Sequence, residues 1–159
     1  MLVCIAVTGN LSTQDKVASR AFYTELGGAS VLYSVNIDGR FKSAQHLGFG
    51  YRVGLGYVRT RRGNGWNGNV IVPFGFNYLL GKSDSPHIFE ISSGGSFGYN
   101  SAYGRSDNCP GCEMFGYIGF AYRKQPLDGG VMWKAGITTI IIEHIVIPLY
   151  PSFSFGYAF

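Results

Sequence analysis

Two cysteines in the segment DNCPGCEM form the most compact chemical motif of the sequence. A pair spaced like Cys109 and Cys112 makes a disulfide, half of a zinc site or a redox centre. A zinc site needs two more ligands at suitable spacing, and a redox pair usually opens a helix next to a strand; the neighbouring sequence offers neither. Because the chain carries the signs of export described below, we expect a disulfide in a loop. Free thiols, metal binding and redox chemistry are the alternatives.

A serine, a histidine and an acid held together can make a nucleophile. His144 beside Glu143 is the best candidate, and Ser101 or Ser106 would supply the hydroxyl from another segment, but no spacing in the sequence supports this combination. We therefore expect no catalytic residue, no metal site and no cofactor. The remaining histidines lie in short segments that we expect to be turns: His46 and His87.

Charged residues are few, and several fall at positions that alternate with large apolar residues. Alternate residues of a strand point to opposite faces, so these charges share the face opposite the apolar one. Their signs are mixed, and charges inside a protein must pair because an isolated buried charge is expensive. We expect a salt-bridge network that fills a barrel; a narrow conduit for protons or small ions and a catalytic site are the alternatives. The expected members are Glu25, Asp38, Arg40, Arg52, Glu90, Arg123 and Lys134.

The composition indicates which elements position these groups. Aromatic residues make up 16% of the 159 residues, charged residues only 14%, and there are 24 glycines. Soluble domains carry about a quarter of charged residues. No run of about 18 to 20 apolar residues exists to form a spanning helix, so alternating strands with one apolar face fit best. The net charge of +4 comes partly from Arg59, Arg61 and Arg62, which we interpret as a solvated loop and not as a nucleic-acid site.

The C-terminal segment shows the strand pattern most clearly. From Leu149 to Phe159, every second residue is large or apolar, and the residues between them are mostly small. Large residues outside and small ones inside suit lipid around a narrow lumen, the reverse of a soluble barrel. A proline within one such segment, Pro73, would mark a bulge or a position near the rim. The same alternation predicts strands in the ranges 47–58, 69–80, 87–99, 114–124 and 131–139.

The first pair of strands requires a change of phase. If residues 22–27 continued in phase with the apolar face of residues 31–37, Glu25 would face lipid, at a cost of about 2 kcal/mol near mid-bilayer. A tight hairpin at Gly27-Gly28 removes the conflict and gives eight strands, and bacterial single-chain barrels have even strand numbers. The sequence therefore predicts an all-β fold, an eight-stranded antiparallel up-and-down transmembrane β-barrel.

The segments between the strands alternate between short and long. Segments 41–46, 81–86 and 124–130 are short, whereas 60–68 and 100–113 are longer. Short periplasmic turns and longer outer loops are the usual asymmetry, which places both termini in the periplasm. The apolar segment IIIEHIVI is expected to be two strand ends that extend beyond the membrane and are interrupted at Glu143-His144.

The N-terminal segment has the features of a processed leader. Met1 to Val7 is a short apolar run followed by small and polar residues, as at the end of a secretory signal peptide. Cys4 lies within the run and not after it, which argues against a lipoprotein. The basic residues that usually precede such a run are missing, so we expect the true start to lie upstream. We expect residues 1–13 to be a signal-peptide remnant and residues 14–159 to be the barrel domain.

Several short motifs along the chain, in this order, resemble the OmpA/OmpX-like small outer-membrane barrels, in particular a family of Bacteroidetes type. The resemblance covers nearly all of the expected mature chain and implies location and fold more than activity. It also implies that the last strand carries the signal for the outer-membrane assembly machinery, in Phe155, Tyr157 and Phe159. The motifs are ELGG at 25–28, LYSVN at 32–36, RVGLGY at 52–57, GFNYLLGK at 75–82, AYRKQP at 121–126, GGVMWKAG at 129–136 and the terminal FSFGYAF.

The expected function follows from this location. We expect an integral protein of the Gram-negative outer membrane without catalytic activity, with a structural or adhesion role or a role as accessory subunit of a larger outer-membrane complex. An outer-leaflet lipid A-modifying enzyme, a narrow ion or proton conduit and a soluble lipocalin-like binder are the alternatives. The expected partners are outer-membrane lipid or lipopolysaccharide, the barrel assembly machinery during insertion and that larger complex, but no nucleic acid.

Overall fold

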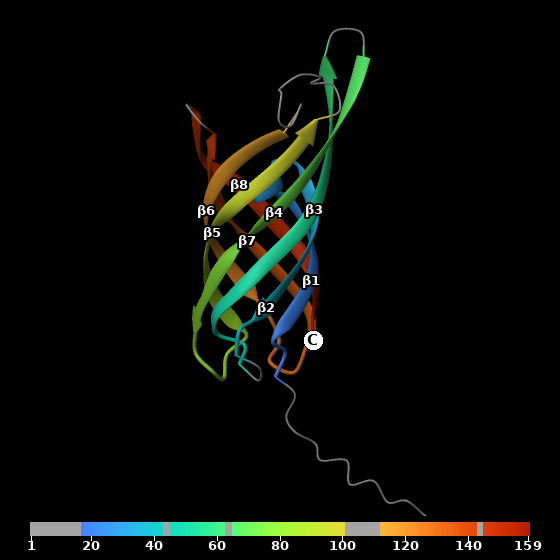
Figure 1. The fold of residues 1–159 in the computed structure, drawn as a ribbon. Coiled ribbons are helices and arrows are strands. Elements are labelled where there is room, and N and C mark those ends of the chain that lie inside the picture. The colour runs from blue at the N-terminus through green and yellow to red at the C-terminus, as the bar shows by residue number, and fades with distance from the viewer. Residues whose placement is uncertain (1–16, 43–44, 63–64, 101–111, 143–144) are drawn as a thin grey trace, which may run out of the picture.

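The computed structural model describes residues 17–42, 45–62, 65–100, 112–142 and 145–159. Eight strands form a closed antiparallel barrel, in which each strand pairs with the next and β8 returns to β1 (Figure 1). This confirms the predicted all-β, up-and-down, eight-stranded architecture. Across the described residues, no helix is long and apolar enough to cross a membrane. The elements are β1 Arg20–Gly27, the short 3-10 helix η1 Gly28–Ser30, β2 Tyr33–Arg40, β3 Gly48–Arg62, β4 Gly65–Gly81, β5 His87–Asn100, β6 Cys112–Lys124, β7 Gly130–Ile142 and β8 Ile145–Ala158.

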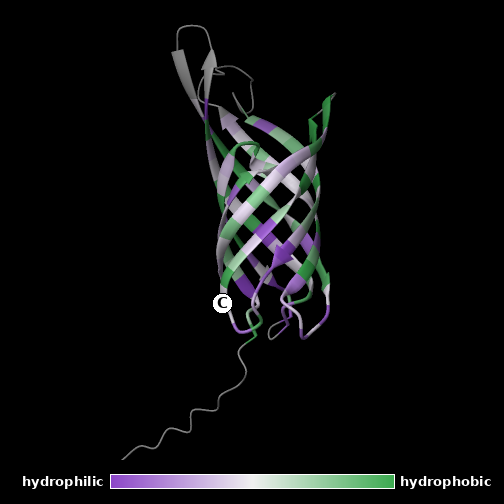
Figure 2. Ribbon diagram, turned by 180° about the vertical axis from the view of Figure 1, so that it is seen from behind, coloured by the Kyte–Doolittle hydropathy of each residue, from purple (hydrophilic) through white to green (hydrophobic). Residues whose placement is uncertain are grey.

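Large apolar side chains cover the outside of the barrel, and polar or small side chains line its inside. On β8, Phe153 and Phe155 are 48% and 54% exposed, whereas Ser154 between them is 1% exposed. Figure 2 shows the resulting bands of hydrophobic and hydrophilic residues along the strands. Because paired residues of neighbouring strands point to the same face, the outward residues join into an apolar belt around the barrel. Each strand contributes to this belt, for example through Phe22, Val35, Phe49, Phe76, Phe89, Phe120, Val131 and Phe155.

The barrel wall is uneven, because β1 and β2 are shorter than the strands beside them. β1 pairs with β8 only as far as Gly27, and the pairing of β2 with β3 ends at Gly56. β3 and β4 continue to pair with each other as far as Arg62, opposite Gly65. The solvated loop expected around the arginines is therefore mostly strand, and that expectation is wrong. We call this projecting two-stranded segment, at the top right of Figure 1, the β3–β4 arm; it comprises residues 58–62 and 65–69.

The connection between β1 and β2 folds into the barrel instead of forming a tight hairpin. The chain does turn at Gly27-Gly28, as expected, but η1 then enters the lumen, and its residues are buried. The Ser96 hydroxyl, on β5, donates a hydrogen bond of 2.6 Å to the carbonyl of Ala29, and the Tyr150 hydroxyl donates one to the carbonyl of Val31. We call residues 27–31 the plug; η1 is the blue turn near the β8 and β4 labels of Figure 1.

Backbone geometry explains why the plug begins with two glycines. Gly27 and Gly28 have φ values of +74° and +67°, in a region that residues with a side chain rarely adopt. A Cβ on Gly27 would also lie 2.1 Å from the carbonyl oxygen of Pro151. Val31 adopts φ of 70° without being a glycine, which stores strain in the plug. The buried contacts of the plug stabilise this conformation.

Pro73 does not have the role expected from the sequence, whereas the strand ends of β7 and β8 do lie where the sequence predicts them. Pro73 lies within β4 and is fully buried, and the pairing with β3 resumes beyond it in the same register, so it marks neither a bulge nor the rim. The one irregularity in the β7–β8 ladder lies between Thr138 and Ile140, where Leu149 on β8 has φ of 55°. The expected strand ends are present, since β7 runs to Ile142 and β8 starts at Ile145; residues 143–144 lie outside the described residues.

We predict that Gly27→Ala destabilises the barrel more than Gly48→Ala. Both glycines have positive φ, which costs an L residue about 1–2 kcal/mol, but only at Gly27 does the new Cβ meet backbone, because nothing lies within 4 Å of that position at Gly48. The free energies of unfolding would be measured by urea titration in detergent micelles. Equal losses for the two variants would contradict the described entry into the plug.

Candidate functional site

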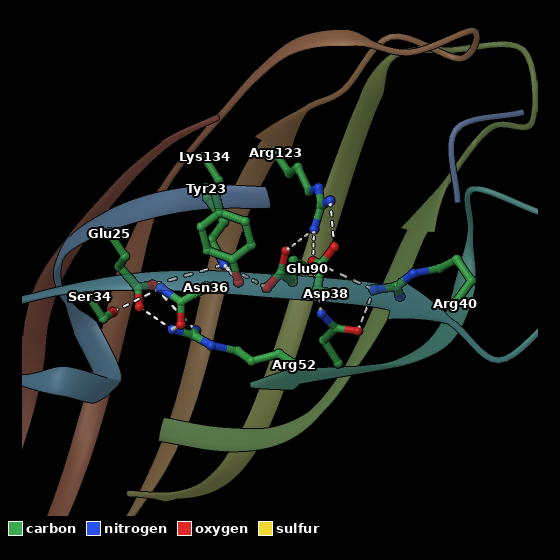
Figure 3. Close-up of polar contacts among 11 residues, drawn as sticks. Tyr23, Glu25, Ser34, Asn36, Asp38, Arg40, Arg52, Glu90, Arg123 and Lys134 are labelled. Atoms are coloured by element: carbon green, nitrogen blue, oxygen red, sulfur yellow. Dashed lines mark hydrogen bonds and ion pairs between the residues drawn. The ribbon is translucent and has the colours of Figure 1, made fainter. Parts of the chain in front are cut away.

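The seven predicted lumen charges all lie inside the barrel, where each is at most 8% exposed. They come from six strands and converge inside the barrel (Figure 3). Strand alternation positions them, because each occupies an inward position of its strand. They are Glu25 on β1, Asp38 and Arg40 on β2, Arg52 on β3, Glu90 on β5, Arg123 on β6 and Lys134 on β7.

Arg52 and Glu25 form the first group of contacts. The Arg52 guanidinium donates through both terminal nitrogens to the two carboxylate oxygens of Glu25, the planar geometry that makes such pairs strong. Nη2 of Arg52 also donates to Oδ1 of Asn36 at 3.0 Å, and Nδ2 of Asn36 donates to the Ser34 hydroxyl at 2.8 Å. Arg52, Glu25, Asn36 and Ser34 thus form a continuous chain of side-chain hydrogen bonds.

Arg123 and Asp38 form the second group. Both terminal nitrogens of Arg123 donate to Asp38, and Nη1 donates also to Oε2 of Glu90 at 3.1 Å. Arg40 lies 3.7 Å from the same Asp38 carboxylate and donates at 2.6 Å to Oδ1 of Asn77. Asp38 therefore accepts hydrogen bonds from Arg123 and lies at ion-pair distance from Arg40.

Lys134 connects the two groups. Its Nζ donates to Oε1 of Glu90 at 3.1 Å and lies 3.9 Å from Oε1 of Glu25. The same Nζ lies 4.4 Å from the centre of the Tyr23 ring and donates to the Tyr23 hydroxyl at 3.2 Å. All seven charges thus belong to one connected set, which we call the lumen network: the seven charges with Tyr23, Ser34, Asn36 and Asn77.

Glycines make room for the long side chains of the network. A Cβ on Gly50 would lie 2.3 Å from Cζ of Arg40, and a Cβ on Gly54 would lie 2.2 Å from Oδ1 of Asn36. The small inward residues predicted for β3 therefore leave the space that polar side chains of β2 occupy.

The lumen is filled at the level of the network. The enclosed space among Glu25, Arg52, Glu90 and Lys134 is about 10 Å³, which is about the volume that one water molecule needs. An apolar cluster closes the barrel towards the short turns, and the plug lies on the opposite side of the network. The arrangement cross-links the wall and leaves little space for a solute. The members of the apolar cluster are Ala18, Ala21, Tyr23, Met132 and Ala158.

The other predicted site residues lie elsewhere. Cys112 is disulfide-bonded, while Cys109 lies outside the described residues, as do Ser101, Ser106, Glu143 and His144. Nδ1 of His87 makes a hydrogen bond with the Tyr122 hydroxyl on the outer face. Among the described residues, no group of His, Cys, Asp and Glu is arranged to hold a metal ion. Of the predicted assembly signal, Phe155 and Tyr157 lie on the outer face of β8, and exposed Phe159 follows the strand directly.

Sequence reasoning missed the uncharged members of the network, above all Tyr23. Its position alternates with outward Phe22 and Thr24, so strand phase was the available signal. No protein-family model, no curated protein and no solved structure matches this chain.

We predict that Asp38→Asn lowers the free energy of unfolding by about 3–5 kcal/mol, because it leaves buried Arg123 without its bidentate partner. The matched control is Asp84→Asn, at an exposed turn position between β4 and β5, which we expect to change stability by less than about 0.5 kcal/mol. Urea titrations in micelles would measure both. Equal unfolding midpoints for the two variants would contradict a stabilising lumen network.

We predict that His46 makes the barrel less stable as the pH falls. His46 lies in the β2–β3 connection and is 5% exposed, and this burial lowers the pKa of its imidazole below the ordinary value. The unfolded chain takes up the proton at about pH 6.5, before the folded chain does, so stability is lost as the pH decreases through that value. The unfolding midpoint measured between pH 7.5 and 5.5 should fall less for His46→Gln than for the unchanged chain. Parallel curves would show that His46 does not contribute.

Proposed function

We propose that this protein is an integral barrel of a bacterial outer membrane, without catalytic activity, with a structural or adhesion role or as accessory subunit of a larger outer-membrane complex. The inverted polarity of the barrel carries the proposal. Phe49 and Phe76 on the outside are 65% and 61% exposed, whereas Glu90 and Arg123 inside are 1% exposed. Water outside would favour the opposite arrangement, and a continuous apolar surface of this kind marks contact with lipid or protein.

The two ends of the barrel support an orientation in the membrane. The described parts of the connections after β2, β4 and β6 lie at one end, together with the described start of the chain and the C-terminus (Figure 1). The β3–β4 arm projects from the other end. Short turns face the periplasm in barrels of this kind, so we propose periplasmic termini and an arm outside the cell. The terminal Phe159 then lies where the assembly machinery would contact it.

The filled lumen supports a role that does not depend on transport. Every described charge of the lumen network has an oppositely charged partner within 4 Å, and the plug and the apolar cluster lie on either side of it. The resemblance to OmpA/OmpX-like barrels agrees with this proposal. Partners would therefore contact the outer surface of the protein. The apolar belt would contact lipid, and the β3–β4 arm and the loops would make contacts beyond the membrane.

Refolding in the presence and absence of lipid tests the membrane location. We predict that residues 14–159, diluted from urea, form β-structure only with detergent micelles or lipid vesicles, because only these cover the apolar belt. The folded form should migrate differently from the boiled form on gels and should resist protease in vesicles. A folded, monodisperse protein in buffer without detergent would contradict the proposal and would favour a soluble binder instead.

A further inference from the structure

We infer that the outer face of β2, β3 and β4, below the β3–β4 arm, binds one phosphate-bearing lipid, with an acyl chain in an apolar groove and the phosphate at Arg59. The inference rests on the proposed membrane location and adds a specific site to it. It names one lipid class and one face of the barrel, whereas the apolar belt alone would contact any lipid.

The groove lies on the outer face, near the end of the apolar belt. Its volume is about 290 Å³. Two rows of paired outward residues border it, one formed by Val35 opposite Leu55 and the other by Tyr57 opposite Val70. Such a cleft accepts a hydrocarbon chain and offers few groups to a polar one. Its lining residues are Tyr33, Val35, Leu55, Gly56, Tyr57 and Val70.

The barrel wall differs in height on the two sides of the groove, because β2 is short and the β3–β4 arm is long. The pairing of β3 with β2 ends at Gly56, opposite Ser34, so β3 is not paired with β2 from Tyr57 onward. On the other side, Arg59 is paired with Gly68, which has no side chain. A Cβ on Gly68 would lie 2.6 Å from the Tyr57 hydroxyl, so the tyrosine extends over this glycine. A headgroup above the groove would therefore lie beyond the end of β2 and next to a strand of the arm.

The arm supplies the charge that an anionic headgroup needs. Arg59 is exposed and follows Leu55 and Tyr57 on the same outward face of β3. The segment 58–69 contains three arginines and no acidic residue. A guanidinium binds phosphate through two parallel hydrogen bonds. The end of an apolar belt is the level of the lipid headgroups, so an acyl chain in the groove would place its phosphate near Arg59.

A strand of a partner protein is less suited than a lipid to the gap above β1 and β2. A partner hairpin would have to continue the sheet between the free edges of β3 and β8. The stretch of β8 beyond its pairing with β1 contains Pro148 and Pro151, which lack the backbone donor that strand addition requires. Lipid contact needs no such donors.

Lipid titrations monitored by native mass spectrometry test this site. The barrel, refolded in an uncharged detergent, would be titrated with lipid A, with the same lipid after removal of its phosphates, and with inorganic phosphate alone. We expect one tightly bound lipid A and weaker binding of the dephosphorylated lipid. Arg59→Gln should weaken lipid A binding by about tenfold, as loss of a charged hydrogen bond does. Val70→Trp should weaken both lipids by filling the groove.

Matched variants on other faces provide the controls. Lys124→Gln removes an exposed charge at the opposite end of the barrel, and Val131→Trp adds the same bulk to β7; neither should change lipid A binding. The inference is overturned if phosphate removal has no effect, if Lys124→Gln matches Arg59→Gln, if inorganic phosphate alone binds as tightly, or if a second copy occupies the groove. Failure to insert into vesicles would overturn the proposed function as well, whereas insertion without phosphate preference would overturn only this site.

Discussion

The pairing of charges inside the barrel is the constraint on which the rest of the structure depends. Asp38, Glu90 and Glu25 each accept from a cation, and Arg123 and Lys134 each contact two of these acids. A buried charge without a partner is costly, so each side chain has to reach its partner across the lumen. This fixes the register of the strands that carry them, since a shift by one residue would turn a charge towards the apolar outside. The need to pair these charges also explains the inward glycines and the filled lumen. The long charged side chains take up the interior, so the neighbouring inward positions have to be small.

Strand alternation made the barrel predictable from the sequence. Period-two patterns show which residues share a face, and the position of Glu25 was sufficient to require the turn at Gly27-Gly28. The same patterns placed the charged residues inside. They do not say which charges meet, because Asp38 and Arg123 are 85 residues apart and only the closed barrel brings them together. Tyr23 shares the strand phase of Glu25 and was missed because its type resembles that of the outward aromatic residues, although its position does not.

Two local features were beyond sequence reasoning. The plug begins with a pair of glycines that equally suits a tight hairpin, and only contacts with distant strands, such as the one from Ser96 to Ala29, draw the chain inward. The β3–β4 arm is rich in glycine and asparagine, which favour loops, yet cross-strand pairing as far as Arg62 keeps it extended. In both cases tertiary contacts override the local preference of the residues.

The long sequence separations within the lumen network have a consequence for assembly. Lys134 reaches Tyr23 across 111 positions, and the pairing of β1 with β8 joins the two ends of the described chain. A sheet that enters the bilayer before closing would carry unmatched carboxylates and guanidinium groups into hydrocarbon. For the membrane location proposed above, insertion is therefore expected to be coupled to closure. β8 carries no charge of the lumen network, but its pairing with β1 and β7 closes the ring of strands that holds these charges together.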